Sequence, residues 1–282
     1  MRLSFTPLKS TALITGASAG LGAEFARQLA PKASRIILVG RREARLWALA
    51  SELQPGAPHL RIDCFPADLS LATERQRLAT WVIREQIPVN LLINNAGLGD
   101  LGSFDTAPWE RIAPMLELNI TALTHLTHLM LPMLKAQVAP HSSAILNVSS
   151  VAGFFPLPDL AVYAATKAYV TSFSEALRME LAPEGIIVTA LCPGPVPTEF
   201  LQVASRPGEI TRTEDRSPSA LHATAAEVVR DALRALEKNK PDVVPNRFLA
   251  LLIRGALLLP FPIRRMVISL GAGPRSSKAG KH

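Results

Sequence analysis

The sequence is poor in the residues that crosslink small secreted folds or bind metals. Its 282 residues include only two cysteines, Cys64 and Cys192, which lie far apart within apolar runs. Isolated cysteines in such runs behave as small buried hydrophobes, so we expect neither a disulfide framework nor a cysteine metal site. This usage is typical of a protein in a reducing compartment.

Aromatic residues are also scarce, at 5% of the chain, although 48% of the residues are apolar. The core is therefore expected to be mostly aliphatic and alanine. A chain of this length can bury one large α/β core without needing a second domain. Residues 1–10 contain no long apolar run, so we expect no secretory signal there.

Acidic residues are almost absent from the C-terminal part of the chain. From Asp242 to His282, seven Lys and Arg residues stand against Asp242 alone. Because the net charge of the whole chain is +7, the preceding body is nearly neutral. A neutral body argues against nucleic acid as a partner, and the basic tail needs its own explanation.

The chain does contain a regular alternation of short apolar runs and helical patterns. The apolar runs read as buried strands at residues 11–15, 35–39, 60–65, 89–93, 143–148, 186–192 and 242–244. Helical patterns lie at residues 23–29, 45–53, 71–87, 109–136, 160–181 and 225–236. This alternation predicts an α/β fold: a Rossmann-type, doubly wound parallel sheet of about seven strands with helices on both faces.

A glycine-rich turn joins the first predicted strand to the first helix, at Gly16, Gly20 and Gly22. A strand, a glycine turn and a helix together present backbone N–H groups and a positive helix end to a phosphate. The arrangement favours a dinucleotide site, and a tight connection without a ligand is the alternative. The spacing is Gly-x-x-x-Gly-x-Gly, not the commoner Gly-x-Gly-x-x-Gly.

Arg41 and Arg42 stand where NAD-binding proteins carry an acidic residue, about 20 residues past the glycines. A guanidinium can clamp a 2′-phosphate in bidentate fashion. The alternative is a pair of solvated arginines at a helix start, which is where cations are least favourable. The pair therefore favours NADPH over NADH.

Polar and small residues follow two further strands at their carboxyl ends. Asp68 could accept a hydrogen bond from an adenine amino group, or cap the next helix, a role for which Ser70 competes. Asn94 is expected mainly to pin neighbouring strands, with Ala96 and Gly97 near the cofactor.

The helical pattern of residues 109–136 contains polar residues that need an explanation. Asn119 lies among apolar neighbours and is a poor helix former, so we expect it to make a local kink or to hold a water. His125 and His128 have no third ligand nearby. They indicate packing or an interface, and no metal site is expected.

Tyr163 and Lys167 lie four residues apart in a predicted helix, so they project from the same face. Free tyrosine has a pKa of about 10, and a fixed ammonium nearby favours the phenolate and lowers that pKa. A tyrosine tuned in this way can give a proton to a carbonyl oxygen or take one from an alcohol. Tyr-x-x-x-Lys also occurs by chance in surface helices, so its meaning depends on the other motifs.

Together these motifs resemble the single-domain branch of the short-chain dehydrogenase/reductase family, over residues 11–244. The resemblance rests on an ordered set: Gly16-x-x-x-Gly20-x-Gly22, Asn94-Asn95-Ala96-Gly97, Asn119, Ser150, Tyr163, Lys167 and Pro193-Gly194. It implies an oxidoreductase that moves a hydride between NADP(H) and a carbonyl or secondary alcohol. The alternative is a non-catalytic dinucleotide-binding sensor or interaction protein, which the presence of Tyr163 and Lys167 disfavours.

The resemblance implies a catalytic role for four residues of this chain. Tyr163 would be the acid/base, and Lys167 would bind the nicotinamide ribose and lower the pKa of the tyrosine. Ser150, rather than Ser149, would hydrogen-bond the substrate carbonyl. Asn119 would hold the water of a proton relay to Lys167.

The resemblance also implies the cofactor contacts. Thr198 would meet the nicotinamide carboxamide, Asp68 the adenine and Arg41 the 2′-phosphate. Many NADPH-dependent members carry a basic residue in the glycine loop, where this chain has Ser18-Ala19, so phosphate binding depends on Arg41 and Arg42. The full implied set is Gly16, Ser18, Gly20, Leu21, Gly22, Arg41, Arg42, Asp68, Leu69, Asn95, Ala96, Gly97, Tyr163, Lys167, Pro193, Gly194, Val196 and Thr198.

Two segments bear on the substrate. Residues 199–222 are polar without clear periodicity, which is typical of a lid or of disorder. The apolar loop of residues 151–158, with Phe154, Phe155 and Leu157, suggests an apolar pocket for a lipid-like, steroid-like or aromatic carbonyl compound.

Residues 246–282 form a basic, apolar extension beyond the predicted domain of residues 1–245. Arg254 and Pro260 interrupt its apolar run, and a membrane span needs about 20 apolar residues. An apolar helix beside arginines could lie on an anionic membrane surface. The alternative is a helix packed over the substrate cleft or against a second subunit.

Family members commonly pair through the helices that carry Asn119 and Tyr163. The resemblance therefore implies a homodimer or homotetramer, and we expect a cytoplasmic protein that could contact a membrane peripherally.

Overall fold

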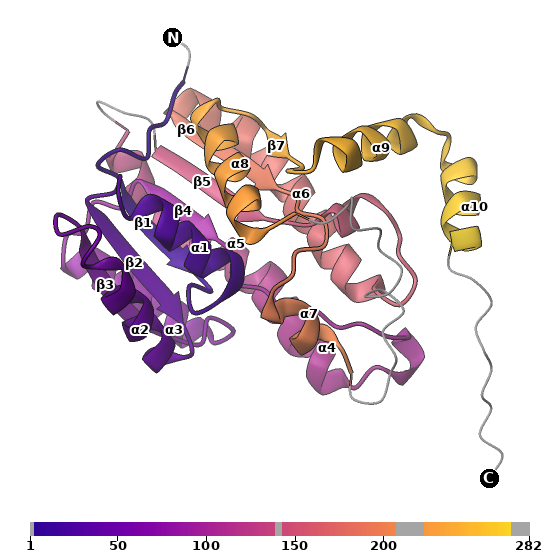
Figure 1. The fold of residues 1–282 in the computed structure, drawn as a ribbon, viewed down its shortest axis with the longest axis horizontal. Coiled ribbons are helices and arrows are strands. Elements are labelled where there is room, and N and C mark those ends of the chain that lie inside the picture. Colours follow the sequence, from indigo (N-terminus) through magenta and orange to yellow (C-terminus); the bar gives the residue numbers. More distant parts are fainter. Residues whose placement is uncertain (1–2, 139–142, 207–222, 272–282) are drawn as a thin grey trace.

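Every apolar run that the sequence marks as a strand forms one in the computed structural model, which describes residues 3–138, 143–206 and 223–271 (Figure 1). These strands make one parallel sheet in the order β3-β2-β1-β4-β5-β6-β7. Their bounds are β1 Thr11–Thr15, β2 Arg35–Gly40, β3 Arg61–Pro66, β4 Leu91–Asn94, β5 Ser143–Val148, β6 Ile186–Leu191 and β7 Asp242–Val243. The predicted fold class is confirmed.

Side chains along each strand alternate between two apolar layers, one on each face of the sheet. In β1, Ala12 and Ile14 belong to one buried cluster and Leu13 to the other. The first cluster is closed by α1 Gly20–Leu29, α2 Glu43–Leu53 and α8 Ala225–Glu237. The second is closed by α3 Ala72–Arg84, α5 Leu123–Ala136 and α6 Ala161–Leu181.

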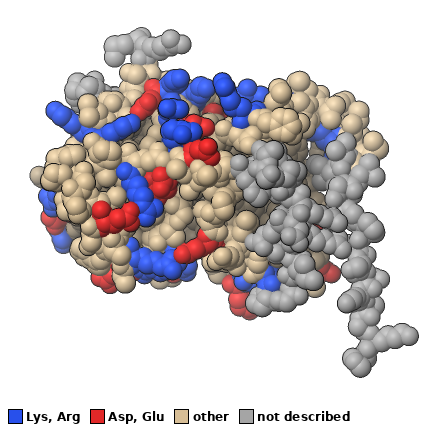
Figure 2. Space-filling model, viewed as in Figure 1, with Lys and Arg blue, Asp and Glu red and all other residues tan. Residues whose placement is uncertain are grey.

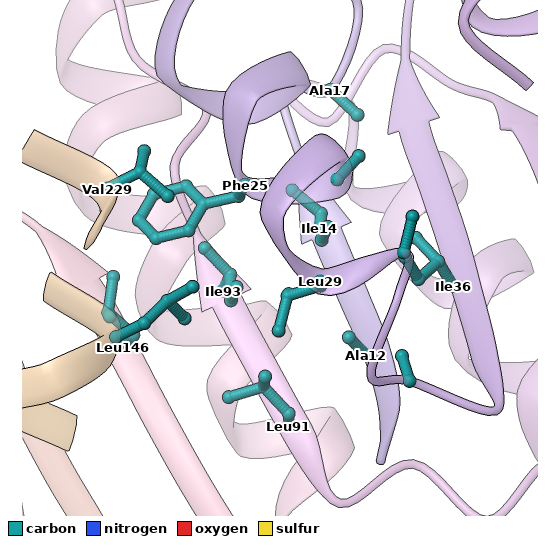
Figure 3. Close-up of a cluster of buried hydrophobic side chains, with 14 of the residues drawn as sticks. Ala12, Ile14, Ala17, Phe25, Leu29, Ile36, Leu91, Ile93, Leu146 and Val229 are labelled. Atoms are coloured by element: carbon teal, nitrogen blue, oxygen red, sulfur yellow. The ribbon is translucent and has the colours of Figure 1, made fainter. Parts of the chain in front are cut away.

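The first layer is mostly aliphatic, as the shortage of aromatic residues predicts. Phe25 is its largest fully buried side chain. In Figure 3 it lies beside Val229 of α8, with Leu29 and Ile14 in the same cluster. Helices thus cover both faces, so ligands can reach the sheet only at its edges.

The strand order reverses between β1 and β4. The chain runs outward from β1 through β2 to β3 and then returns to place β4 on the other side of β1. In open parallel sheets, such a switch point opens a crevice at the carboxyl ends of the strands, where ligands bind. The glycine turn after β1 and the Asn94–Gly97 segment after β4 therefore flank one crevice.

The region around Asn119 is not a single α-helix. It consists of α4 Trp109–Leu116, the π-helical segment η2 Glu117–Ala122, and α5. Short π-helical stretches are frequent at functional sites. The expected irregularity at Asn119 therefore takes the form of a wider helical turn.

The segment from residue 199 departs from the prediction of a run without regular structure. Residues Glu199–Ala204 form α7, and the hydroxyl of Thr198 accepts a hydrogen bond from the N–H of Phe200 at its start. The prediction was wrong here because the helix is too short to show a periodicity. Residues 207–222, the remainder of the predicted lid, lie outside the described residues. The other short elements are η1 Phe104–Thr106, η3 Val151–Phe154 and η4 Ala182–Glu184.

A buried ion-pair cluster fixes the chain just after α7. Arg206 and Arg111 each lie 2.6 Å from a carboxylate oxygen of Asp100, in the loop that follows β4. Burial opposes ionisation of Asp100, but the hydrogen bonds from Arg206 and Arg111 hold its pKa below the usual range. The cluster therefore ties the end of α7 to the loop beside the crevice.

Asn94 acts as the expected pin between strands. Its amide nitrogen donates to Asn147 Oδ1 of β5 and to Thr127 Oγ1 of α5, both at 2.9 Å. All three side chains are buried, so these hydrogen bonds also fix β4 against the helix layer.

The structure describes both cysteines, and also His125 and His128. Cys192 is buried and Cys64 half-buried, and neither forms a disulfide. His125 accepts a hydrogen bond from Arg75 of α3 and so packs between two helices, whereas His128 is exposed. Among the described residues, no group of three or more His, Cys, Asp and Glu side chains is placed to hold a metal ion.

The C-terminal extension forms two helices, α9 Arg247–Leu258 and α10 Phe261–Gly271. They leave the body next to β7 and extend beyond the sheet (Figure 1). None of the described helices is long and apolar enough to cross a bilayer. Over the body, basic and acidic side chains lie next to each other on the face seen in Figure 2, consistent with its small net charge.

Candidate functional site

The glycine turn after β1 and the first turn of α1 pack so closely that only glycine fits at position 22. A side chain on Gly22 would lie 2.3 Å from the carbonyl oxygen of Gly16. The amide of Asn95 donates to the carbonyls of Thr15 and Gly16 and holds the turn from the β4 side. No side chain caps α1 at Ala19, so its first N–H groups suit an anionic oxygen.

The two arginines after β2 belong to a cluster that already holds an anion. Arg42 donates to Ser18 Oγ at 3.2 Å and to Glu199 at 2.9 Å, and Arg45 donates to both oxygens of Glu199. Hydrogen bonds from Arg42 and Arg45 lower the pKa of Glu199. Arg41 is exposed beside them. A carboxylate is thus bound between two guanidiniums, and phosphate binding by the arginines stays a prediction.

Asp68 does not cap the following helix, so that alternative was wrong. Its Oδ1 accepts from the N–H and the hydroxyl of Ser70, at 3.0 and 2.7 Å. The N-cap residue of α3 is Leu71, which makes no side-chain capping bond. Leu69 is buried in the second apolar layer. The adenine contact of Asp68 stays a prediction.

The segment after β4 meets Asn119 and Lys167. A side chain on Gly97 would lie 3.2 Å from Asn119 Oδ1 and 3.5 Å from Lys167 Nζ. Asn119 accepts from the N–H of Leu98 and donates to its carbonyl and to Thr166 Oγ1. Asn119 therefore ties the loop to α6, and a water held for a proton relay stays a prediction.

Tyr163 and Lys167 lie one turn apart near the start of α6. Lys167 Nζ lies 5.7 Å from the centre of the Tyr163 ring and donates to the carbonyl of Val148, at the end of β5, at 2.9 Å. Ser150, two residues further on, lies close enough to the Tyr163 hydroxyl to influence its pKa. The structure thus gathers three of the four implied catalytic side chains at the carboxyl end of β5.

The pKa of Tyr163 differs from the sequence-based expectation. Burial raises it to about 12, against the hydrogen bond with Ser150, which lowers it. The expected lowering by the ammonium was wrong for this structure, because the lysine head group is directed at the carbonyl of Val148. Burial also lowers the pKa of Lys167 to about 8. At neutral pH, the tyrosine is therefore a protonated donor and most of the lysine is charged.

The two serines after β5 differ in what their hydroxyls do. Ser149 Oγ donates to the carbonyl of Lys167 at 2.8 Å and lies 2.7 Å from Thr171 Oγ1. Ser150 Oγ accepts from the N–H of Ala152 and faces Tyr163. Ser149 is therefore a bracing residue, and the role of Ser150 as the substrate contact stays a prediction.

The loop after β6 crosses the glycine turn. The carbonyl of Pro193 accepts from the N–H of Val151, and Val196 is buried in the first apolar layer. A side chain on Gly20 would lie 3.5 Å from Thr198 Cβ. Gly194 and Thr198 therefore lie along the crevice that Gly16, Gly20 and Gly22 open, with Leu21 packed against the core.

Several side chains of this site were missed from the sequence. The ring of Phe200 lies 5.6 Å from that of Tyr163, centre to centre. Thr15 Oγ1 accepts from the N–H groups of Asn95 and Ala96. Arg45 could have been found, since it follows Arg41 by one helical turn. Phe200 carries no such signal, because its contact with Tyr163 joins distant segments of the chain.

The family model for short chain dehydrogenases matches residues 10–207. The chain belongs to the short-chain dehydrogenase/reductase family. The members of this family are oxidoreductases that act on alcohol and carbonyl groups with a nicotinamide dinucleotide, and this chain is one of these enzymes.

Named relatives cover most of the chain. Sulfoacetaldehyde reductase 2 of Chromohalobacter salexigens is 38% identical over 200 residues, which are 68% of this chain and 74% of that protein. A short-chain dehydrogenase from Sphingobium yanoikuyae in complex with NADPH has a TM-score of 0.77 and 30% identity, covering 97% of this chain and 99% of its own. A bulky-bulky ketone-specific alcohol dehydrogenase from Comamonas testosteroni has a TM-score of 0.73 and 29% identity, covering 98% of each chain.

The residues of this short-chain dehydrogenase fit the family's dinucleotide. The glycine cradle leaves no room for a Cβ at Gly22, and the start of α1 is uncapped. At the other end of the crevice, Lys167 is buried with its ammonium beside Gly97. These features suit a pyrophosphate at the turn and a ribose near the lysine.

The contrast between the two serines gives a matched test. Ser150→Ala is expected to lower kcat by about a hundredfold with little change in cofactor binding, because it removes one donor to the reacting oxygen. Ser149→Ala is expected mainly to lower the free energy of unfolding, by about 1 kcal/mol, since it removes a hydrogen bond that braces α6. Steady-state kinetics and denaturant unfolding of both variants measure this. Equal kinetic losses in the two would contradict the assignment.

The pKa of Lys167 predicts the pH dependence of carbonyl reduction. The lysine is charged below a pH of about 8 and neutral above it. Loss of the ammonium removes the cation that lies beside Gly97, where the cofactor ribose is expected, so kcat/KM for reduction is expected to fall as the pH rises through about 8. A non-ionisable ketone substrate serves for the measurement. A profile that stays flat to a pH of about 10 would disprove this role.

Proposed function

We propose that this enzyme is an NADP(H)-dependent oxidoreductase that interconverts an apolar carbonyl compound and its secondary alcohol, with Tyr163 as acid/base. The observation that carries the proposal is the meeting of Ser150, Tyr163 and Lys167 at the carboxyl end of β5. The alternative, a dinucleotide-binding sensor without turnover, is not favoured, because all three side chains are present and lie together at the end of β5.

Each of these residues has a chemical task in the proposal. The nicotinamide cofactor, when bound, supplies or accepts the hydride. Tyr163 gives its proton to the carbonyl oxygen during reduction, and Ser150 donates a hydrogen bond to the same oxygen. Lys167 binds the ribose hydroxyls through its ammonium group. Asn119, packed between Leu98 and Thr166, holds the relay water near Lys167.

The preference for NADP(H) is supported by the arginine cluster. Arg42 and Arg45 lie close enough to share one carboxylate, and Arg41 adds a third cation. A doubly charged 2′-phosphate would bind such a cluster more strongly than a ribose hydroxyl would. The NADPH in the solved relative from Sphingobium yanoikuyae agrees with this preference.

The apolar character of the substrate is supported mainly by Phe200, which packs on the Tyr163 ring. Of the loop residues expected to contribute, Phe154 instead lines a cavity between α6, β7 and α9. Phe155 and Leu157 stay as candidate pocket residues. The relative from Comamonas testosteroni is named for bulky ketones, which fits an apolar pocket, whereas sulfoacetaldehyde is small and anionic.

We also propose the broader organisation implied by the family resemblance. Residues 1–245 would form the catalytic domain, with a substrate lid around residues 199–222, and residues 246–282 an extension. The enzyme would work in the cytoplasm as a homodimer or homotetramer, with peripheral membrane contact through the extension.

Replacing the proposed acid/base tests the reaction class. Tyr163→Phe is expected to lower turnover at least about a hundredfold, because the variant has no proton to donate. NADPH binding, measured by fluorescence titration, should be unchanged. Retention of most of the activity on a panel of ketones and aldehydes would rule out Tyr163 as the acid/base.

Replacing the arginines tests the cofactor preference. Arg41→Ser together with Arg42→Ser is expected to weaken NADPH binding by at least about tenfold, since a charged hydrogen bond contributes about 1.5–3 kcal/mol. NADH binding should change little, because NADH has no 2′-phosphate. Arg27→Ser is the matched control, because Arg27 lies in the last turn of α1 and forms an exposed ion pair with Glu52. Equal losses for both cofactors would contradict 2′-phosphate recognition.

A further inference from the structure

We propose that α9 and α10 form a surface anchor that lays the C-terminal extension on a bilayer containing anionic lipids. The proposal rests on three features of the described residues: an unpartnered apolar face, a set of arginines beside it, and helices too short to cross the membrane. It rests on the peripheral membrane contact proposed above and adds the class of lipid and the residues that bind it. It does not depend on the proposed oxidoreductase activity.

Helix α9 has two apolar faces, and only one of them contacts the protein. On the inner face, Ile253 is buried, and Ala250, Ile253 and Leu257 line the cavity next to α6. The outer face consists of residues spaced as one helical stripe: Phe248, Leu251, Leu252, Gly255, Leu258 and Leu259. All of the large side chains in this stripe are exposed.

The outer face is open as well as apolar. Leu251 is 69% exposed and Leu258 is 87% exposed. A side chain added at Gly255 would meet no atom within 4 Å. In α10, Phe261, Ile263 and Met266 continue the exposed apolar surface. A contiguous patch of this kind on a protein surface marks an interaction site.

The charges beside this surface are all of one sign. Residues 243–282 contain no Asp or Glu, whereas Arg247, Arg264 and Arg265 lie in α9 and α10. A fourth arginine, Arg254, lines the inner cavity. Arg264 Nε is buried, with no hydrogen-bond partner among the described residues. Basic residues at an apolar face complement anionic headgroups, which attract each cation while the apolar side chains enter the interface.

The alternative partner, a second copy of this chain, fits the charge less well. Two copies meeting through this face would bring two arginine sets together without acidic residues in either extension to pair with them. A cavity of about 480 Å³ also lies between α9 and the body, lined by residues of α6, β7 and α9. A surface anchor needs no closer packing than this.

The test uses the full-length protein and two kinds of vesicle, phosphatidylcholine alone and phosphatidylcholine with phosphatidylglycerol. We expect co-sedimentation with the anionic vesicles only. Leu251→Asp with Leu258→Asp should weaken that binding at least about tenfold, because two exposed side chains no longer enter the interface. Each of Arg247→Gln and Arg265→Gln should weaken it about fivefold.

The controls separate lipid binding from folding, assembly and activity. Ile83→Asp changes a leucine-sized side chain that is 55% exposed on α3, away from the extension, and should leave vesicle binding intact. Ketone reduction by the double aspartate variant in lipid-free buffer should stay unchanged, since no catalytic residue is altered. An inactive enzyme that still binds vesicles would refute only the proposed reaction.

Three results would overturn the proposal: full-length protein that stays in the supernatant with both vesicles, equal binding to neutral and anionic vesicles, or a double aspartate variant that binds as the parent does. The face would instead be assigned to a second copy of the chain if the parent bound no vesicles and formed a dimer in light scattering that the double aspartate variant did not form.

Discussion

The site depends on a pair of buried hydrogen bonds that join the end of β5 to α6. Lys167 Nζ donates to the carbonyl of Val148, and Ser149 Oγ donates to the carbonyl of Lys167. One residue of the helix is thus bonded by both its side chain and its backbone to two consecutive residues of the strand end. Ser150 comes next in the chain and Tyr163 lies one turn earlier on the helix. Their relative position is therefore set by rigid elements, as a preorganised donor pair requires.

Burial also sets the ionisation of the Lys167 and Tyr163 side chains. Removing the lysine from water disfavours its charged form, and removing the tyrosine from water disfavours the phenolate. The pKa values of Tyr163 and Lys167 consequently move apart, to about 12 and about 8. The sequence shows the charge of the lysine but not the burial of the two side chains, so the predicted direction of the tyrosine pKa was wrong.

The sequence predicted the sheet well because strand signals are local. Runs such as residues 11–15 and 143–148 are continuously apolar, as strands covered on both faces must be. It also placed Asn94 and Ser150 correctly, since residues at the carboxyl ends of parallel strands meet at one edge. What it missed depends on contacts between distant segments. Phe200 beside Tyr163 and Glu199 between two arginines result from how α7 crosses the crevice, which no periodicity encodes.

Ion pairs hold both ends of α7, but one pair is buried and the others are exposed. After its C-terminal end, Arg206 and Asp100 pair at 2.6 Å and are both buried, so breaking that pair would leave an uncompensated charge inside the protein. At its N-terminal end, Glu199 pairs with Arg42 and Arg45 on the surface, where water and salt compete with each partner. The C-terminal end of α7 is thus held to the loop after β4 by a buried ion pair. At its N-terminal end, near the glycine turn, the ion pairs of Glu199 are open to exchange with water and salt. Thr198 and Phe200 lie between these ends, so the part of the chain that faces Tyr163 is the part whose outer contact an incoming anion can replace.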